Sequence, residues 1–81
     1  MKSKDDVRQA LLGILRDMDK ECEYKAGADI FADFGLDSLD QIEFLFNIEQ
    51  AFSIKIEDDT FEEQGLRQFD QLVDHLHAAQ A

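Results

Sequence analysis

The sequence contains no proline and a single cysteine, Cys22. One cysteine cannot form an internal disulfide or assemble a cysteine-based metal site, so we expect a reducing, cytoplasmic setting and an incidental thiol. No apolar run reaches the length of a membrane span, and the N-terminal residues lack the apolar stretch of a secretory signal. We therefore expect a cytoplasmic protein that does not enter a membrane.

Basic residues are also scarce, with eight against nineteen acids and a net charge of −11. A surface of that sign repels nucleic acid, which excludes DNA and RNA as partners. Residues 1–25 are balanced, whereas residues 26–81 hold only two bases against thirteen acids. Because no base lies between Lys25 and Lys55, we expect the acids of this stretch to face solvent or a basic surface on another molecule. This stretch is therefore predicted to dock another molecule.

The chain is long enough for one small domain and too short for a large catalytic scaffold. Hydrophobic residues make up 44% of it, which is sufficient to build one core. No internal repeat, low-complexity tract or linker divides it. We therefore expect residues 1–81 to form a single domain.

Apolar periodicity predicts helices at both ends of the chain. One helix face is indicated by residues at steps of four, three and four: Val7, Leu11, Ile14 and Met18. This predicts a helix over about residues 4–18, started by Ser3 and the acids that follow it. A last amphipathic helix is predicted to about residue 78 by Phe69, Leu72, Val73 and Leu76.

The middle of the chain predicts a long loop and two more helices. Residues 19–36 follow neither period and form a loop pinned by apolar side chains, Ile30, Phe31, Phe34 and Leu36. A helix over 39–52 follows, capped by Asp37 or Ser38, with Gln41 completing a capping box with Ser38. A short helical turn around Phe61 ends at Gly65. The predicted fold is an all-α bundle of three longer helices and one short one, with a long first loop.

The helix over 39–52 carries two apolar stripes, whose centres lie roughly 140° apart on a helical wheel. The first comprises Leu39, Ile42 and Phe46, and the second comprises Phe44, Leu45, Ile48 and Phe52. One stripe is enough to pack a helix into a small bundle. The other, beside Asp40 and Glu43, is either a wide core contact or an exposed site for a partner.

Ser38 stands at the start of this helix, after a glycine turn and between two carboxylates. A nucleophilic serine needs a base and oxyanion donors, but both histidines lie in the last predicted helix and no G-x-S-x-G elbow is present. A hydroxyl at a helix N-terminus can instead accept a phosphate ester, which the free N–H groups stabilise. In that use Ser38 would carry an attached group and perform no chemistry itself.

No metal site is expected. His75 and His77 are two apart in a helix and do not face the same way. Asp29, Asp33 and Asp37 fall four apart, whereas a calcium loop needs oxygens at alternate positions and a central glycine.

Residues 31–52 read FADFGLDSLDQIEFLFNIEQAF, and this segment resembles the attachment site of the acyl carrier proteins. The most specific part is Gly-Leu-Asp-Ser-Leu at residues 35–39, and the similarity to the free-standing bacterial type covers the full chain in length and helix order. The resemblance implies a carrier, not an enzyme, in which Ser38 receives 4′-phosphopantetheine from coenzyme A. A separate transferase attaches this group, and an acyl intermediate is then held on its sulfur as a thioester.

The resemblance also divides the two stripes by role. It implies a recognition face made of Asp37, Leu39, Asp40, Ile42, Glu43 and Phe46. The partners it implies are the phosphopantetheinyl transferase and the acyl-loading, elongating and unloading enzymes, all with basic patches, which would meet a monomeric carrier. The residues it places inward, around an acyl chain, are Phe44, Leu45, Ile48 and Phe52.

The pathway stays open between fatty acid, polyketide, lipid and peptide biosynthesis. Many relatives have an Ile-Pro-Asp-Glu type segment after the second helix, where this chain reads Ile-Lys-Ile-Glu-Asp at residues 54–58. The phenylalanines of the second helix are also bulkier than the aliphatic residues familiar from fatty acid synthesis. A second function remains as an alternative, an unmodified acidic helical adaptor that binds a basic protein through the same stripe.

Overall fold

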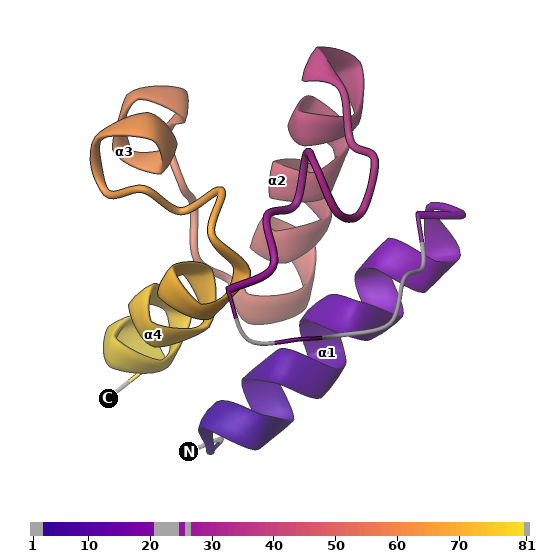
Figure 1. Cartoon of the computed structure of the whole chain (residues 1–81). Coiled ribbons are helices and arrows are strands. Elements are labelled where there is room, and N and C mark those ends of the chain that lie inside the picture. Colours follow the sequence, from indigo (N-terminus) through magenta and orange to yellow (C-terminus); the bar gives the residue numbers. More distant parts are fainter. Residues whose placement is uncertain (1–2, 21–24, 26, 81) are drawn as a thin grey trace.

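The computed structural model describes residues 3–20, 25 and 27–80, and within them the chain is helical (Figure 1). The helices are α1 (Lys4–Asp17), α2 (Ser38–Phe52), α3 (Asp58–Glu63) and α4 (Phe69–Gln80). The described residues form no strand beyond an isolated bridge between Asp29 and Gln68. The predicted all-α bundle of three longer helices and one short helix is confirmed.

Helix α1 begins and ends through side-chain and backbone hydrogen bonds that the local sequence supplies. The Ser3 hydroxyl accepts from the Asp6 N–H at 3.2 Å, and the Asp6 carboxylate accepts from the Ser3 N–H at 3.2 Å. At the other end Asp19 is left-handed, with φ 59°, and the Lys20 N–H donates to the Leu15 carbonyl at 2.8 Å. This is the Schellman arrangement, which usually uses glycine, so no glycine marks the end of α1.

The buried face of α1 differs from the predicted one. Val7, Leu11 and Leu15 are fully buried, while Ile14 and Met18 are only partly buried at the edge of the core. Val7, Leu11 and Leu15 are spaced four residues apart, and side chains at this spacing form the ridge through which helices commonly pack against one another. All four predicted residues pack in or against the core, but the prediction omitted Leu15, which is fully buried.

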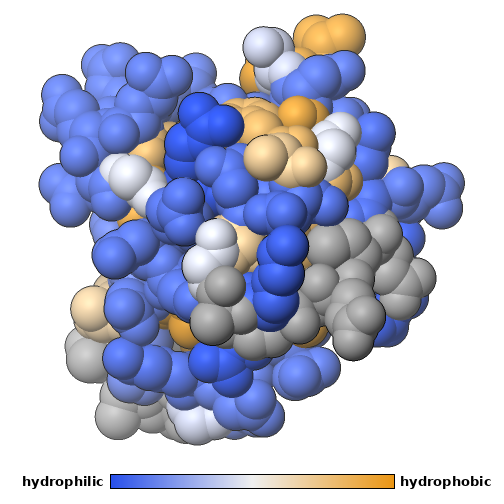
Figure 2. Space-filling view, in the orientation of Figure 1, coloured by the Kyte–Doolittle hydropathy of each residue, from blue (hydrophilic) through white to orange (hydrophobic). Residues whose placement is uncertain are grey.

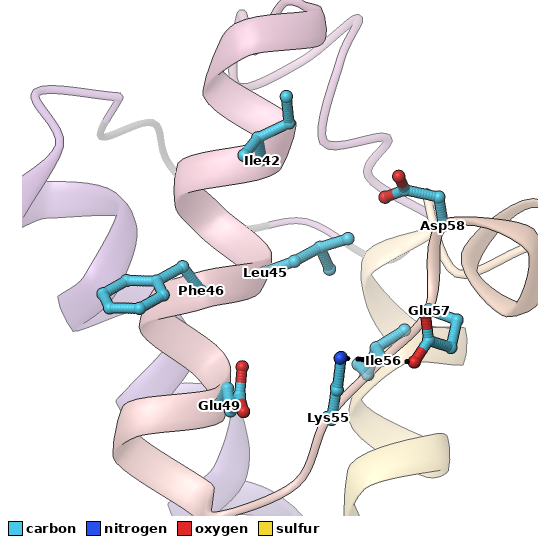
Figure 3. Close-up of a pocket in the computed structure, with 8 residues that line it drawn as sticks. All are labelled: Ile42, Leu45, Phe46, Glu49, Lys55, Ile56, Glu57 and Asp58. Carbon is cyan, nitrogen blue, oxygen red and sulfur yellow. Dashed lines mark ion pairs between the residues drawn. The ribbon is translucent and has the colours of Figure 1, made fainter.

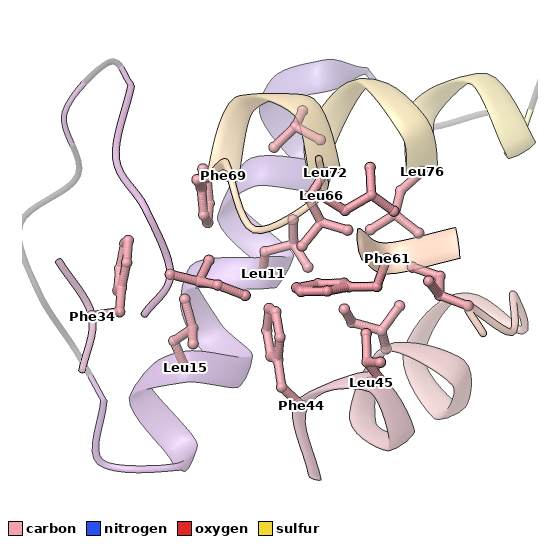
Figure 4. Close-up of a cluster of buried hydrophobic side chains, with 14 of the residues drawn as sticks. Leu11, Leu15, Phe34, Phe44, Leu45, Phe61, Leu66, Phe69, Leu72 and Leu76 are labelled. Carbon is pink, nitrogen blue, oxygen red and sulfur yellow. The ribbon is translucent and has the colours of Figure 1, made fainter. Parts of the chain in front are cut away.

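The core draws side chains from all four helices and from the first loop (Figure 4). Phe44, Phe61 and Phe69 bring one aromatic ring each from α2, α3 and α4, and all three are at most 2% exposed. Phe34 of the loop stacks on Phe69 with 5.6 Å between ring centroids. None of the described buried residues is polar or charged. Burial of apolar surface therefore holds the bundle together.

The first loop is pinned as predicted, and it is also hydrogen-bonded to the start of α4. The Ile30 N–H donates to the Arg67 carbonyl at 2.9 Å, and the Phe69 N–H donates to the Ala28 carbonyl at 2.8 Å. The Asp29 carboxylate accepts from Arg67 at 2.8 Å. Burial raises the pKa of Asp29, but the hydrogen bonds from Arg67 and from nearby backbone N–H groups outweigh it and lower the pKa below its ordinary value.

Leucine-to-alanine substitutions on α1 test which side chains contribute to core packing. Leu15→Ala is expected to lower the free energy of unfolding by about 2–5 kcal/mol, because a fully buried side chain leaves a cavity. Leu12→Ala, at a partly buried position, is expected to cost about 1 kcal/mol. Urea denaturation followed by circular dichroism measures both, and equal losses would contradict the observed burial.

Candidate attachment site

Ser38 is exposed at the first turn of α2, directly after a tight turn in the loop. Gly35 has φ +76°, a conformation that side chains with a Cβ rarely adopt, and its N–H donates to the Phe31 carbonyl at 3.0 Å. Leu36 then anchors the chain in the core with 5% exposure. The turn therefore brings Ser38 out of the core to the surface at the start of the helix.

The cap of α2 is Asp37, one of the two predicted candidates. The Asp37 carboxylate accepts from the Asp40 N–H at 2.9 Å, and the Asp40 carboxylate accepts from the Asp37 N–H at 3.1 Å. The predicted capping box between Ser38 and Gln41 is therefore wrong, because a carboxylate one residue earlier performs this role. In the described part of the chain, no residue hydrogen-bonds to the Ser38 hydroxyl. The hydroxyl is therefore not occupied by helix capping.

Asp40 has a basic partner that the local sequence did not reveal. Its carboxylate lies 3.1 Å from the Lys20 ammonium, and the aspartate side chain is 23% exposed. The hydrogen bond from the Asp37 N–H and then the contact with Lys20 lower the pKa of Asp40 below its ordinary value of 3.8. The expectation that the acids between Lys25 and Lys55 face solvent or a basic surface on another molecule is wrong for Asp40, which pairs with Lys20.

Two further acids of the same stretch are paired in the same way. Asp29 contacts Arg67, and Asp33 lies 3.4 Å from the Lys25 ammonium. Arg67 is thirty-eight positions from Asp29 and Lys25 is eight positions from Asp33, so no local charge pattern showed either pairing. The acids that remain exposed on α2 itself include Glu43.

The two apolar stripes of α2 separate as the helical wheel predicted. Phe44, Leu45, Ile48 and Phe52 lie in the core, whereas Leu39, Ile42 and Phe46 are 76%, 61% and 57% exposed. These three are the exposed large hydrophobic side chains of the described residues. Figure 2 shows one face of the molecule, which is mostly hydrophilic with only small hydrophobic areas. The exposed stripe is therefore a surface feature and not a wide core contact.

A groove of about 320 Å³ lies between α2 and the segment that leads into α3 (Figure 3). Its lining residues are Ile42, Leu45, Phe46, Glu49, Lys55, Ile56, Glu57 and Asp58. Leu45 points from α2 toward the segment that carries Ile56, and the Lys55 ammonium lies 3.6 Å from the Glu57 carboxylate. The sequence analysis noted the lysine in this segment but did not predict that the segment lines a groove.

The remaining candidate residues, among them the two histidines, form no metal site in the described part of the chain. The described residues contain no group of three or more His, Cys, Asp or Glu side chains that could hold a metal. His75 and His77 are both partly exposed on α4. Cys22 lies outside the described residues. No helix in the described ranges has the length and apolar character needed to cross a membrane.

Comparisons with known proteins match this site. A family described as "Phosphopantetheine attachment site" matches residues 5–76, which include Ser38 and all of α2. The chain is also similar to the mitochondrial acyl carrier protein of Saccharomyces cerevisiae, with 36% identity over 80 residues. The alignment covers 91% of this chain and 62% of that relative, so the chain spans less than two thirds of its length.

The pH dependence of stability tests the role of Asp40. Because the pKa of Asp40 is lowered in the folded state, its contribution is present above about pH 3.8 and is lost as the pH falls through the lowered value. Asp40→Asn is expected to have a lower melting temperature than wild type at pH 7, and the difference is expected to close below pH 3.8.

Glu43→Gln is the matched control, since it removes one exposed negative charge from the same helix without touching the cap. It is expected to change the melting temperature little at any pH. Thermal melts of the three proteins from pH 7 to pH 3 measure the effect. A pH-independent loss in Asp40→Asn would contradict the electrostatic role.

Proposed function

The chain belongs to the acyl carrier protein family, whose members hold 4′-phosphopantetheine and act as carriers rather than catalysts, and from this we propose that Ser38 is its attachment residue. The observation that supports the assignment is the exposed hydroxyl at the first turn of α2, inside the matched segment. Once attached, the group supplies a terminal thiol on which an acyl intermediate is held as a thioester. The protein then presents this intermediate to other enzymes.

The residues around Ser38 fit a phosphodiester. The N–H groups of the first helical turn have no carbonyl of their own helix to bond, and the helix dipole favours a negative group at this end. The Asp37 and Asp40 carboxylates are turned toward each other's backbone N–H groups. The attachment oxygen therefore faces solvent, where a transferase can reach it.

We propose that the exposed stripe of α2 is the docking face for enzymes with basic patches. Leu39, Ile42 and Phe46 supply apolar contacts, and the acids beside them, Asp37, Asp40 and Glu43, supply a complementary charge. A contact of this kind forms quickly and is weakened by salt. Tethering the intermediate raises its local concentration at each docked enzyme, so tight docking is not required.

We also propose that the acyl chain uses the groove between α2 and residues 55–58. Leu45 and Ile56 give it an apolar wall on each side. Of the four predicted acyl-chain residues only Leu45 lines this groove, whereas Phe44, Ile48 and Phe52 are buried in the core. The pathway remains a choice between fatty acid, polyketide, lipid and peptide biosynthesis. The cytoplasmic location, the monomeric state and the single-domain organisation stay predictions.

The attachment residue is tested by mass spectrometry after incubation with coenzyme A and a broad-specificity phosphopantetheinyl transferase. The wild-type chain is expected to gain the mass of one phosphopantetheine group, and Ser38→Ala is expected to gain none, because no other hydroxyl occupies this turn. Ser53→Ala is a control with an exposed serine at the opposite end of α2, and it is expected to be modified normally. Absence of modification in wild type would favour the acidic adaptor, and undiminished modification of Ser38→Ala would refute the assignment.

Charge reversal tests the docking face. Glu43→Lys is expected to raise the KM of the transferase for the carrier by about three- to ten-fold at low salt, because it places a positive charge where basic side chains approach. Asp40 is a poorer probe, since its reversal also disrupts the helix cap. Glu63→Lys makes the same charge change at an exposed position on α3 and is the control. Equal KM values for the two variants would show that Glu43 is only a solvated residue.

A further inference from the structure

The docking face defined above contains one acid that is already occupied from within the molecule. Asp40 Oδ2 lies 3.1 Å from Lys20 Nζ and also accepts from the Asp37 N–H at 3.1 Å. The lysine and aspartate side chains are 31% and 23% exposed, so each still reaches solvent. A partner's basic side chain can therefore reach Asp40, but the Asp40 carboxylate is already in contact with Lys20.

The backbone places Lys20 at this position. The left-handed conformation of Asp19 ends α1, and the Lys20 N–H is held by the Leu15 carbonyl at 2.8 Å. Because Leu15 is fully buried, this turn is anchored to the core. Lys20 thus reaches α2 from a fixed point at the end of α1, and the contact joins residues that are twenty positions apart.

Lys20 changes the charge that an approaching molecule encounters. A close pair of opposite charges has a field that decays faster with distance than the field of a single charge. Beyond a few ångströms Asp40 therefore adds little to the negative field of the docking face, and Glu43 contributes without an ammonium within salt-bridge distance in the described residues. The net charge of the chain overstates the attraction available beside Ser38.

Lys20 is not needed to keep the first turn of α2 in place. The two hydrogen bonds between Asp37 and Asp40 link these residues directly, and neither involves the lysine. Removal of the ammonium should therefore leave Ser38 where it is and release the charge of Asp40. If Lys20 supported the site, its removal would weaken docking. If Lys20 instead masks Asp40, its removal would strengthen docking.

We propose that Lys20 is an internal competitor for the basic side chains of docking partners, and that docking exchanges Lys20 for a partner's arginine or lysine on Asp40. This inference rests on the proposed docking function of α2. It makes Lys20 a residue that sets how strongly, and with what salt dependence, the carrier is recognised. No bond is made or broken in the exchange, so the effect is confined to docking and does not alter the chemistry at Ser38.

Steady-state kinetics of the transferase with coenzyme A test the proposal. Lys20→Met keeps the length of the side chain and removes its charge, and it is expected to lower KM for the carrier about three-fold at low salt with kcat unchanged. The difference is expected to shrink as salt is added. Lys4→Met is the matched control, because Lys4 pairs with Asp74 at 2.9 Å on α4 and its loss changes the net charge equally. It is expected to leave KM near the wild-type value.

A double-mutant comparison ties the effect to Asp40. In the Asp40→Asn background, Lys20→Met still removes a positive charge beside the docking face but releases no acid, so its reduction of KM is expected to be smaller than in the wild-type background. Lys20→Arg, which keeps the charge, is expected to behave like wild type. The proposal is overturned if Lys20→Met matches Lys4→Met, if it raises KM or lowers kcat, or if its advantage is as large without Asp40 as with it.

Binding without turnover separates this proposal from the assignment of Ser38. The Kd of the transferase for Ser38→Ala and for Ser38→Ala with Lys20→Met can be compared by calorimetry. The double variant is expected to bind about three-fold more tightly. Equal affinities, or no detectable binding, would overturn the role of Lys20 whether or not Ser38 is the modified residue. Circular dichroism of each variant confirms that the helices are retained.

Discussion

The reciprocal hydrogen bonds between Asp37 and Asp40 determine what the start of α2 can do. They satisfy two backbone N–H groups with two carboxylates and leave the hydroxyl between them without a capping role. If Ser38 capped the helix, its oxygen would be held against the backbone and would be less available for modification. A carboxylate cap also persists when the serine is esterified. Stability of the helix start and chemistry at the serine are therefore assigned to different side chains.

Helix α2 serves two purposes because its apolar residues lie on two faces. One face packs Phe44, Leu45 and Ile48 into a core that contains no buried polar side chain among the described residues, and this packing positions the helix. The other face leaves three large apolar side chains in water, a cost that isolated folding would not require. Exposed apolar side chains with acids alongside are the usual composition of a transient interface, where apolar contacts provide affinity and charges provide speed.

The distribution of charge in the folded molecule differs from the count along the chain. Asp29, Asp33 and Asp40 each have a basic partner, and each has a pKa below its ordinary value. The Asp29–Arg67 pair ties the long first loop to the segment before α4, the Asp33–Lys25 pair lies within that loop, and the Asp40–Lys20 pair joins the end of α1 to the beginning of α2. Some of the acidic residues are thus neutralised by a basic partner within the molecule, and they form a structural part of the acidic excess. The second part remains available to other molecules. The exposed acids of the second part include Asp37 and Glu43 beside the exposed stripe of α2, and others such as Glu62 and Glu63 lie on α3.

Periodicity and local residue chemistry determined the helices, the two stripes of α2 and the exposed position of Ser38, because these depend on spacing within a few turns. They did not determine that Leu15 belongs to the core row of α1, nor that Asp37 rather than Ser38 closes the capping box, because several residues there satisfy the same local rules. Only the tertiary structure decided which acids are paired, since Lys20 and Arg67 reach Asp40 and Asp29 across twenty and thirty-eight positions. The groove between α2 and residues 55–58 was likewise decided by packing, because it forms between segments whose separation no linear pattern records.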